Sequence, residues 1–525
     1  MKRNPNLLWG SALVLGWLFD FLFWKQSLGL NFAIYSVLCV AGGFIILLTN
    51  QQRPSGRALW LLPVILFFAS TTVMRAEPLT LFLGILFTLF LMSILAITFI
   101  GGRWFWYSLA DYASGFLKLA GSMLARPLSF ASEVKREKAE SGATTHRLNP
   151  WPIIRGIIIA LPIVAIFASL LASADVVFSN QLDLFIKFFR IENLPQYIFR
   201  LIYILFGAYL LSGVFLHAAY QSKDEKLLGQ DKPLMEPFLG FTESTIVLGS
   251  VIALFAAFVV VQFRYFFGGQ GNINIEGFTY SEYARRGFGE LLIVAFFSLL
   301  MILGLGAVTQ RKDEAQRRLF SGLSVTVVAL VMVILVSAYQ RLTLYEVAYG
   351  FSRLRTYTHV VLIWIGILLG AVVVMEIMRR ERAFAAAALI ASLGFAISLY
   401  ILNVDAFIVR QNANRATHGE DLDVSYLASL STDSVPELVN IFQSPAYPVL
   451  TRDAVGAALF CRLQFGTSRP SIDWRSFSLS SWRSDTGLDS VRTLLARYQV
   501  LDSDWPIRIL TPGNVTYSCY ESSPD

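Results

Sequence analysis

The sequence predicts an all-α polytopic membrane protein with about eleven transmembrane helices, interfacial amphipathic helices and a small, mainly helical C-terminal extracytoplasmic domain. Of its 525 residues, 55% are hydrophobic and only 15% are charged, and the mean hydropathy is +0.58. This composition lies far outside the range of soluble globular proteins. Apolar runs of roughly 20 residues, the length that crosses a hydrocarbon core about 30 Å thick, occur near residues 7–24, 29–49, 58–74, 78–100, 152–173, 197–220, 242–263, 290–309, 318–339, 359–378 and 383–403.

The distribution of lysine and arginine predicts how the chain crosses the membrane. Alternate loops carry 21 basic residues on one side and 10 on the other, and the richer side is expected to be cytoplasmic. The first run lacks an A-x-A-like cleavage site, so we expect an uncleaved first span and a cytoplasmic N-terminus. Eleven crossings then divide the chain into a transmembrane domain, 1–403, and an extracytoplasmic domain, 404–525.

The basic pI of 9.2 results from lysine and arginine residues in the loops between the predicted spans. Residues 404–525 contain 10 arginines, no lysine and 14 acids, while the whole chain carries +7. The positive excess therefore follows the positive-inside pattern and gives no indication of nucleic-acid binding.

Three segments outside the spans show helical amphipathicity. Residues 103–126 are expected to lie on the inner leaflet, followed by a flexible cytoplasmic loop over 132–150. Residues 175–190 place polar side chains four residues apart, which predicts a second amphipathic helix on the outer surface. In the segment 339–359, Arg341, Tyr345, Tyr349 and Arg353 have the spacing of one helical face.

The most polar interruption on the outer side runs from Phe263 to Glu290. Within it, Thr279-x-x-Glu282 has the pattern of a capping box, with Phe278 and Tyr283 as the hydrophobic staple. A helix that begins there would direct its positive end toward the outer surface.

Motifs for cofactors and metals are missing from the sequence. There is no P-loop, no H-E-x-x-H and no C-x-x-C, and the four histidines are scattered. We predict no cofactor and no metal site. A Ser-His-Asp hydrolase stays open, although no G-x-S-x-G motif indicates one. Cys39 falls within a span, whereas Cys461 and Cys519 form a candidate disulfide if the tail lies in an oxidising compartment.

Several stretches resemble the integral membrane family named domain of unknown function 4173. They are FDFLFWKQSLGLN (19–31), ASADVVFS (172–179), FRYFFGG and TYSEYARRGFGEL within 263–291, YEVAYGFSRLR (345–355), NVDAFIVRQNANRA (403–416), GEDLDVSYLASLSTDSVPEL (419–438) and DWRSFSLSSWR (473–483). The resemblance implies a bacterial multi-span inner-membrane protein and no particular activity. ADVVFS departs from it where a proline is expected after the aspartate.

The outer ends of the predicted spans carry the candidate ligand-binding residues. Arginine forks suit phosphate or carboxylate, and tyrosines add hydrogen bonds. In the alternative interpretation, Glu282, Glu290 and Glu346 form ion pairs with the arginines of this set and fix the ends of the helices. The set is Asp20, Arg264, Tyr280, Glu282, Tyr283, Arg285, Arg286, Glu290, Arg341, Glu346, Tyr349, Arg353 and Arg355.

These observations leave three functions open. The first is a non-enzymatic binding, signalling or assembly scaffold, and the second is an enzyme or flippase that handles an anionic lipid-linked substrate at the outer face. The third, a transporter, is disfavoured because ionisable residues are nearly absent at mid-depth of the spans. The expected partners are membrane lipids, including an anionic lipid or lipid-linked intermediate, and a protein that binds the C-terminal domain.

Overall fold

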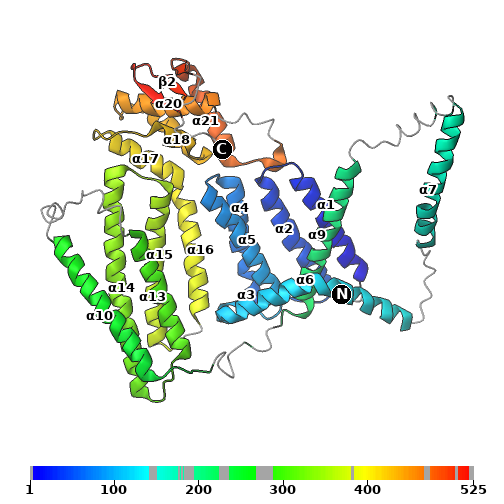
Figure 1. Cartoon of the computed structure of the whole chain (residues 1–525), viewed down its shortest axis with the longest axis horizontal. Coiled ribbons are helices and arrows are strands. Elements are labelled where there is room, and N and C mark those ends of the chain that lie inside the picture. The colour runs from blue at the N-terminus through cyan, green and yellow to red at the C-terminus, as the bar shows by residue number, and fades with distance from the viewer. Residues whose placement is uncertain are drawn as a thin grey trace.

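The chain is an all-α polytopic membrane protein. The computed structural model describes residues 4–140, 151–175, 178, 181, 194–223, 227, 236–267, 288–379, 383–465, 473–502 and 507–519. Among these residues, ten helices are long and apolar enough to cross a membrane. The expected span at 152–173 falls in α7 (Trp151–Ala174), which is helical over its whole length and is drawn apart from the other helices in Figure 1.

The first helical bundle comprises the N-terminal spans and one helix that crosses beneath them. A single hydrophobic cluster that includes Leu8, Phe68 and Phe99 holds these helices together. They are α1 (Pro5–Phe23), α2 (Leu30–Thr49), α3 (Gly56–Leu59), α4 (Leu61–Met74), α5 (Pro78–Thr98), the 3₁₀ turn η1 (Trp104–Trp106), α6 (Leu109–Glu140) and α9 (Leu194–Tyr220).

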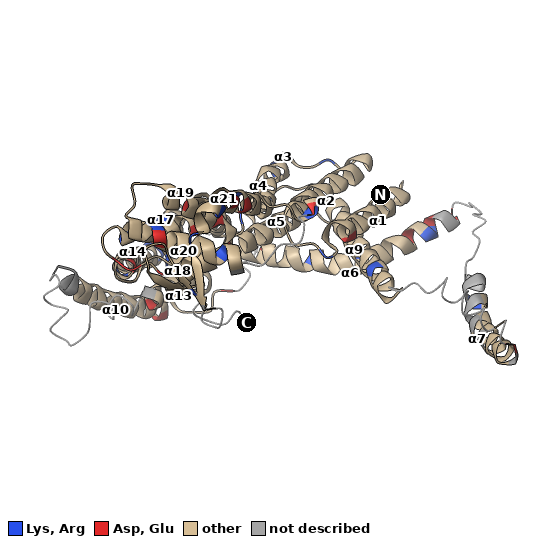
Figure 2. Ribbon diagram, turned by 90° about the horizontal axis from the view of Figure 1, so that it is seen from above, with Lys and Arg blue, Asp and Glu red and all other residues tan. Residues whose placement is uncertain are grey.

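The helix α6 lies across the bundle, at the end opposite to the C-terminal residues (Figure 1). It begins where Ser108 donates its backbone N–H to Asp111 at 2.9 Å. A helix is therefore present within the segment 103–126, but it begins at Leu109 and extends to Glu140. The flexible loop predicted over 132–150 was wrong for residues 132–140, which continue α6. Figure 2 shows positions coloured as charged residues toward that end of the helix.

The second helical bundle has its own hydrophobic cluster, which includes Leu248, Phe320 and Val331. The helix that follows the second bundle in the chain, α16 (Phe384–Leu402), packs against α5 of the first bundle and α15 of the second. The helices of the second bundle are α10 (Phe241–Phe267), α13 (Phe288–Val308), α14 (Glu314–Tyr349) and α15 (Arg353–Ile377).

The outer segment predicted at 339–359 is not a separate helix. Residues up to Tyr349 continue α14, which at 36 residues is about 54 Å long and exceeds the hydrocarbon thickness. Gly350, at φ +80°, ends α14, and Arg353 starts α15. Arg353 therefore does not share a helical face with Arg341 and Tyr349, because the chain turns between them.

Residues 404–525, here called the tail, lie across the ends of α4, α5, α14, α15 and α16 (Figure 1). The tail residues surround one hydrophobic cluster that includes Val435, Leu459 and Ile509. The tail is mainly helical, as predicted, and its described residues form five α-helices. They are α17 (Val404–Ala416), α18 (Val424–Ser429), α19 (Val435–Gln443), α20 (Val449–Phe465) and α21 (Leu479–Leu495), with 3₁₀ turns η4 (Thr432–Ser434) and η5 (Trp474–Ser476).

A small antiparallel sheet completes the tail and was not predicted. Its strands run in the order β1 (Gln499–Asp502), β2 (Arg508–Leu510) and β3 (Thr516–Ser518), and Ile509 pairs with Val500 and Tyr517. Cys519 follows β3 and forms a disulfide with Cys461 of α20, with a Cα–Cα distance of 5.4 Å. The disulfide joins the sheet to the helical part of the tail.

The packing of α15 against α16 predicts that alanine substitutions at two glycines will differ in their effect on stability. A Cβ at Gly394 would lie 2.0 Å from the Trp364 ring, whereas one at Gly370 would meet nothing within 4 Å. We expect Gly394→Ala to destabilise the protein by about 1–3 kcal/mol through overpacking, and Gly370→Ala to leave stability unchanged. Thermal unfolding of the detergent-solubilised protein measures both, and equal midpoints for the two variants would contradict the described packing.

Candidate functional site

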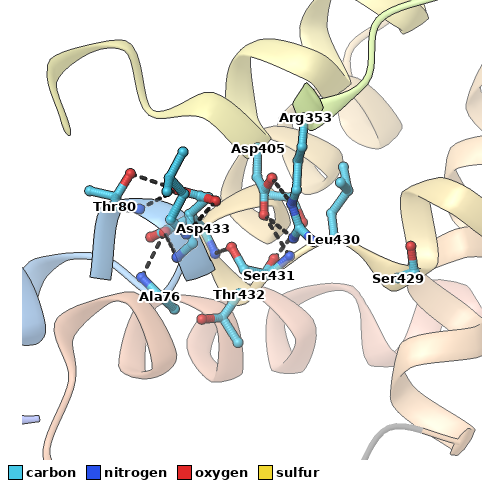
Figure 3. Close-up of polar contacts among 12 residues, drawn as sticks. Ala76, Thr80, Arg353, Asp405, Ser429, Leu430, Ser431, Thr432 and Asp433 are labelled. Atoms are coloured by element: carbon cyan, nitrogen blue, oxygen red, sulfur yellow. Dashed lines mark hydrogen bonds and ion pairs between the residues drawn. The ribbon is translucent and has the colours of Figure 1, made fainter. Parts of the chain in front are cut away.

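A buried polar network joins the tail to both helical bundles (Figure 3). It contains three acids that are almost inaccessible to water: Asp405 at 0%, Glu77 at 1% and Asp433 at 6% exposure. We call this network the junction. It consists of Ala76, Glu77, Thr80, Arg353, Tyr357, Asp405, Tyr426, Ser431 and Asp433.

Asp405, in the first turn of α17, holds the tail to the second bundle. Arg353 at the start of α15 donates Nε to Oδ1 at 2.8 Å and a terminal nitrogen to Oδ2 at 2.6 Å. The backbone N–H of Ser431 donates to the same Oδ2 at 2.7 Å. Tyr426 accepts the backbone N–H of Arg353 at 2.9 Å, so the tail fixes both the main chain and the side chain of Arg353.

Asp433, in η4, holds the tail to the first bundle. Its Oδ2 accepts the backbone N–H groups of Ala76 at 2.7 Å and Glu77 at 2.9 Å. These donors lie in the connection between α4 and α5, where they precede a helix and have no helical partner. Burial nevertheless raises the pKa of Asp433 above its usual range, because desolvation disfavours the charged carboxylate more than these donors favour it.

Glu77 connects the two bundles directly. As the N-cap of α5, it accepts the backbone N–H groups of Leu79 at 2.9 Å and Thr80 at 2.7 Å, which leaves neither donor unsatisfied. It also accepts the hydroxyl of Tyr357 on α15. One carboxylate therefore starts α5 and binds the neighbouring bundle.

Two further contacts place the tail over the turn between α14 and α15. Asn412 of α17 accepts the backbone N–H of Phe351 at 2.8 Å and donates to its carbonyl at 2.9 Å. Arg415 donates to the carbonyl of Val347 at 2.8 Å. A side chain at Gly350 would come within 2.9 Å of Arg415 and Asn412, so the close approach of the tail requires glycine there.

The tail also reaches the connection between α1 and α2. Phe477 accepts the backbone N–H of Leu30 at 2.9 Å. Gln26 donates to Asp473 at 3.2 Å and accepts the hydroxyl of Ser476 at 2.8 Å. The tail is thus bound at three sites, two on the first bundle and one on the second.

A family model described as "Domain of unknown function (DUF4153)" matches residues 61–441. The chain belongs to this family. The match spans most of the chain and contains the whole junction. No curated protein and no solved structure matches the chain.

The family predicted from the sequence resemblance was not the family that matches. The sequence resemblance pointed to domain of unknown function 4173, whereas the matching model is DUF4153. Both names record a family without an assigned activity, so that part of the expectation holds. Two of the stretches that suggested the resemblance, 403–416 and 419–438, contribute Asp405 and Asp433 to the junction.

The predicted ligand-binding residues of this DUF4153 chain do not form one surface. Asp20 lies in the first bundle, where it is 3% exposed and accepts Nε of Arg200 at 2.8 Å and the hydroxyl of Tyr203. Arg353 lies beneath the tail in the junction. The remaining described members lie in the second bundle.

Most described members in the second bundle have partners that belong to the fold. Glu346, 2% exposed, lies 3.1 Å from Nδ1 of His359 rather than beside an arginine. Arg341 donates to Gln262 at 2.7 Å. Arg355 donates to the carbonyls of Tyr349, at 3.2 Å, and of Gly350.

The other members cannot be placed in a site. Tyr349 is 52% exposed and packs edge-on against Tyr345, and Glu290 is exposed in the first turn of α13. The side chain of Arg264 lies outside the described residues, as do the predicted capping box at 279–282 and all but three residues of the amphipathic helix predicted at 175–190. The same holds for Tyr280, Glu282, Tyr283, Arg285 and Arg286.

A buried serine and histidine meet beneath the first bundle but do not form a hydrolase site. Ser122 on α6 lies 2.9 Å from Nδ1 of His217 on α9 and donates to Gln221 at 2.6 Å. Because the hydroxyl proton goes to Gln221, the imidazole does not accept it as a general base would. Exposures of 5% for Ser122 and 1% for His217 also shield the pair from any substrate.

The Arg353–Asp405 pair predicts a large effect of one substitution. We expect Asp405→Ala to destabilise the protein by about 3–5 kcal/mol, because it leaves the half-buried guanidinium without its counter-ion. The matched control is Asp489→Ala, which breaks a pair with Arg492 whose side chains are 65–68% exposed and should cost less than about 1 kcal/mol. Chemical unfolding measures both, and limited proteolysis reports whether the tail is released. Similar losses would contradict the role of the junction.

The pKa of Asp433 predicts a stability that depends on pH. Since the folded-state pKa is raised above the ordinary value of 3.8, the folded chain binds the proton more tightly than the unfolded chain. We expect the stability of the wild type, relative to Asp433→Asn, to rise as the pH falls from neutral toward 4. Thermal unfolding across this window tests the sign, and a falling difference would show that the junction requires the carboxylate form.

Proposed function

We propose that this chain is a non-enzymatic scaffold of the bacterial inner (plasma) membrane, in which the tail holds the two helical bundles together and offers a fixed surface to a protein partner. The observation that carries the proposal is the junction, in which Asp405 binds the second bundle while Asp433, nearby on the same tail, binds the first.

The chemistry of the junction favours a structural role over catalysis. All three buried acids accept hydrogen bonds from backbone or side-chain donors of the protein itself. A catalytic carboxylate needs access to substrate, whereas these groups are at most 6% exposed. The enzyme or flippase alternative would have an open cleft lined by Arg285, Arg286, Arg341 and Arg353. Of these, Arg353 binds Asp405 and Arg341 binds Gln262 instead, and Arg285 and Arg286 lie outside the described residues.

The orientation in this proposal is a cytoplasmic N-terminus and an extracytoplasmic tail. Three observations support it: the excess of basic residues in alternate loops, the position of the N-terminus and the tail at opposite ends of the bundles (Figure 1), and the Cys461–Cys519 disulfide. Disulfides persist in the periplasm and other oxidising compartments and are rare in the cytosol.

The tail has apolar side chains available for a protein partner. Val449 and Leu450 are 62% and 61% exposed at the start of α20, and Val500 and Leu501 are 42% and 54% exposed in β1. Figure 1 shows α20 and the sheet in the part of the tail farthest from the membrane helices. Each of these two pairs is adjacent in the sequence, and contiguous exposed apolar groups favour protein contact. Membrane lipids, including an anionic lipid or lipid-linked intermediate, are the other proposed partners.

Cleavage between the bundles tests whether the tail holds them together. We would insert a protease site between Gly229 and Gln230, in the connection from α9 to α10, purify the intact protein and then cleave it. The expected result is that both fragments elute together in size-exclusion chromatography, and that they separate after cleavage of an Asp405→Ala/Asp433→Ala variant.

The control for this experiment carries the exposed change Asp489→Ala and should behave as the wild type. Fragments that separate in the wild type would overturn the proposal, because the tail would then contribute too little to the association. Fragments that stay together in the double variant would show that contacts other than the junction, such as α16 against α5 or Phe477 with Leu30, suffice for the association. That result would equally overturn the role proposed for the junction.

A further inference from the structure

The loop between α20 and α21 brings an exposed tryptophan to the end of a membrane span. Residues Asp473–Ser478 lie against the connection between α1 and α2, and Phe477 accepts the backbone N–H of Leu30. The approach is close, since a Cβ at Gly29 would lie 2.6 Å from the Phe477 carbonyl. This contact places the loop at the tail-side end of the first bundle.

Trp474 in this loop extends an apolar strip that begins on α1. Its ring centroid lies 6.4 Å from that of Phe21, and Phe21 stacks on Trp17 at 5.7 Å. The exposed fractions of Trp17, Phe21 and Trp474 are 54%, 41% and 54%. Val14 and Leu13, also exposed, continue the strip toward the middle of the span, so apolar surface is continuous from the span to the tail.

The charges of the loop neutralise each other. Arg475 donates Nε to both oxygens of Asp473 at 2.9–3.0 Å and holds the pKa of that carboxyl down to about 2. The guanidinium lies 5.3 Å above the Phe21 ring and also donates to the Phe21 carbonyl at 2.5 Å. The loop therefore presents an aromatic ring beside a closed ion pair, without a free charge.

We propose that the loop Asp473–Ser478 lies in the interfacial region of the leaflet on the tail side, with the Trp474 indole in contact with lipid. Tryptophan favours this region because its ring is apolar and its N–H can bond to water or headgroups. Since the ion pair is closed, the contact is with the boundary between headgroups and acyl chains of any phospholipid. It does not depend on an anionic headgroup.

Collision measurements on a spin label test this contact in the full-length protein. A nitroxide would be attached at Trp474→Cys, with Cys39→Ala as the background, in vesicles of phosphatidylethanolamine and phosphatidylglycerol. Leu450→Cys, in the outer layer of the tail, is the aqueous reference, and Trp17→Cys is the reference within the strip. Non-reducing electrophoresis verifies the tail disulfide in each variant.

The expected ratio of oxygen to nickel-chelate collision rates at Trp474 is several-fold higher than at Leu450 and approaches that at Trp17. The ratio should not change in vesicles of phosphatidylcholine alone. A ratio equal to that at Leu450 would place the loop in water, and slow collisions with both reagents would place it against protein; either result overturns the proposal. A high ratio found only with phosphatidylglycerol would overturn the independence from headgroup charge.

Discussion

The buried carboxylate of Asp405 fixes how the tail meets the second bundle. An isolated ionised carboxylate is very costly to remove from water, so its oxygens need donors in fixed positions. Arg353 supplies two and Ser431 supplies one. The first turn of α15, the first turn of α17 and the turn before α19 must therefore meet in one arrangement, because a shift of any of them would leave a buried charge without its partner.

The same constraint reaches the first bundle through a short stretch of the tail. Ser431 and Asp433 are two residues apart, and Asp433 accepts the N–H groups that precede α5. Glu77, which caps α5, accepts the hydroxyl of Tyr357 on α15. The hydrogen bonds thus form a closed path across the two bundles. Buried polar groups that satisfy one another in this way hold a single geometry, since each partial arrangement leaves a group unpaired.

The sequence was most informative where one physical requirement dominated. Membrane thickness fixes the length of an apolar run, so the positions of the spans followed from the hydropathy of the sequence. The limits of α6 and α14 were missed because both helices continue into polar residues, where hydropathy no longer marks the end. The strands of the sheet, with three or four residues each, are too short to show alternation.

The junction could not be predicted because its partners are remote in the sequence. Ala76 and Asp433 are separated by 357 residues, and no local pattern distinguishes Asp433 from the other acids of a tail that contains 14. The outer arginines were conspicuous for the opposite reason, since charge next to a span is easily recognised. Of these, Arg353 binds a tail acid and Arg355 binds the carbonyls that end α14. These partners can be identified only in the folded structure.

Polar attachment also suits a tail that lies next to a bilayer. The tail also makes apolar contacts with the helices, for example with Leu79, Val360 and Leu402, but lipid competes for such contacts and discriminates poorly between apolar faces. Hydrogen bonds from the backbone N–H groups of Ala76, Glu77 and Phe351 avoid that competition, because lipid chains cannot supply the oxygen acceptors that these donors require. The helix ends therefore act as the recognition elements of the bundles. The acids at positions 405 and 433 make the tail specific for them.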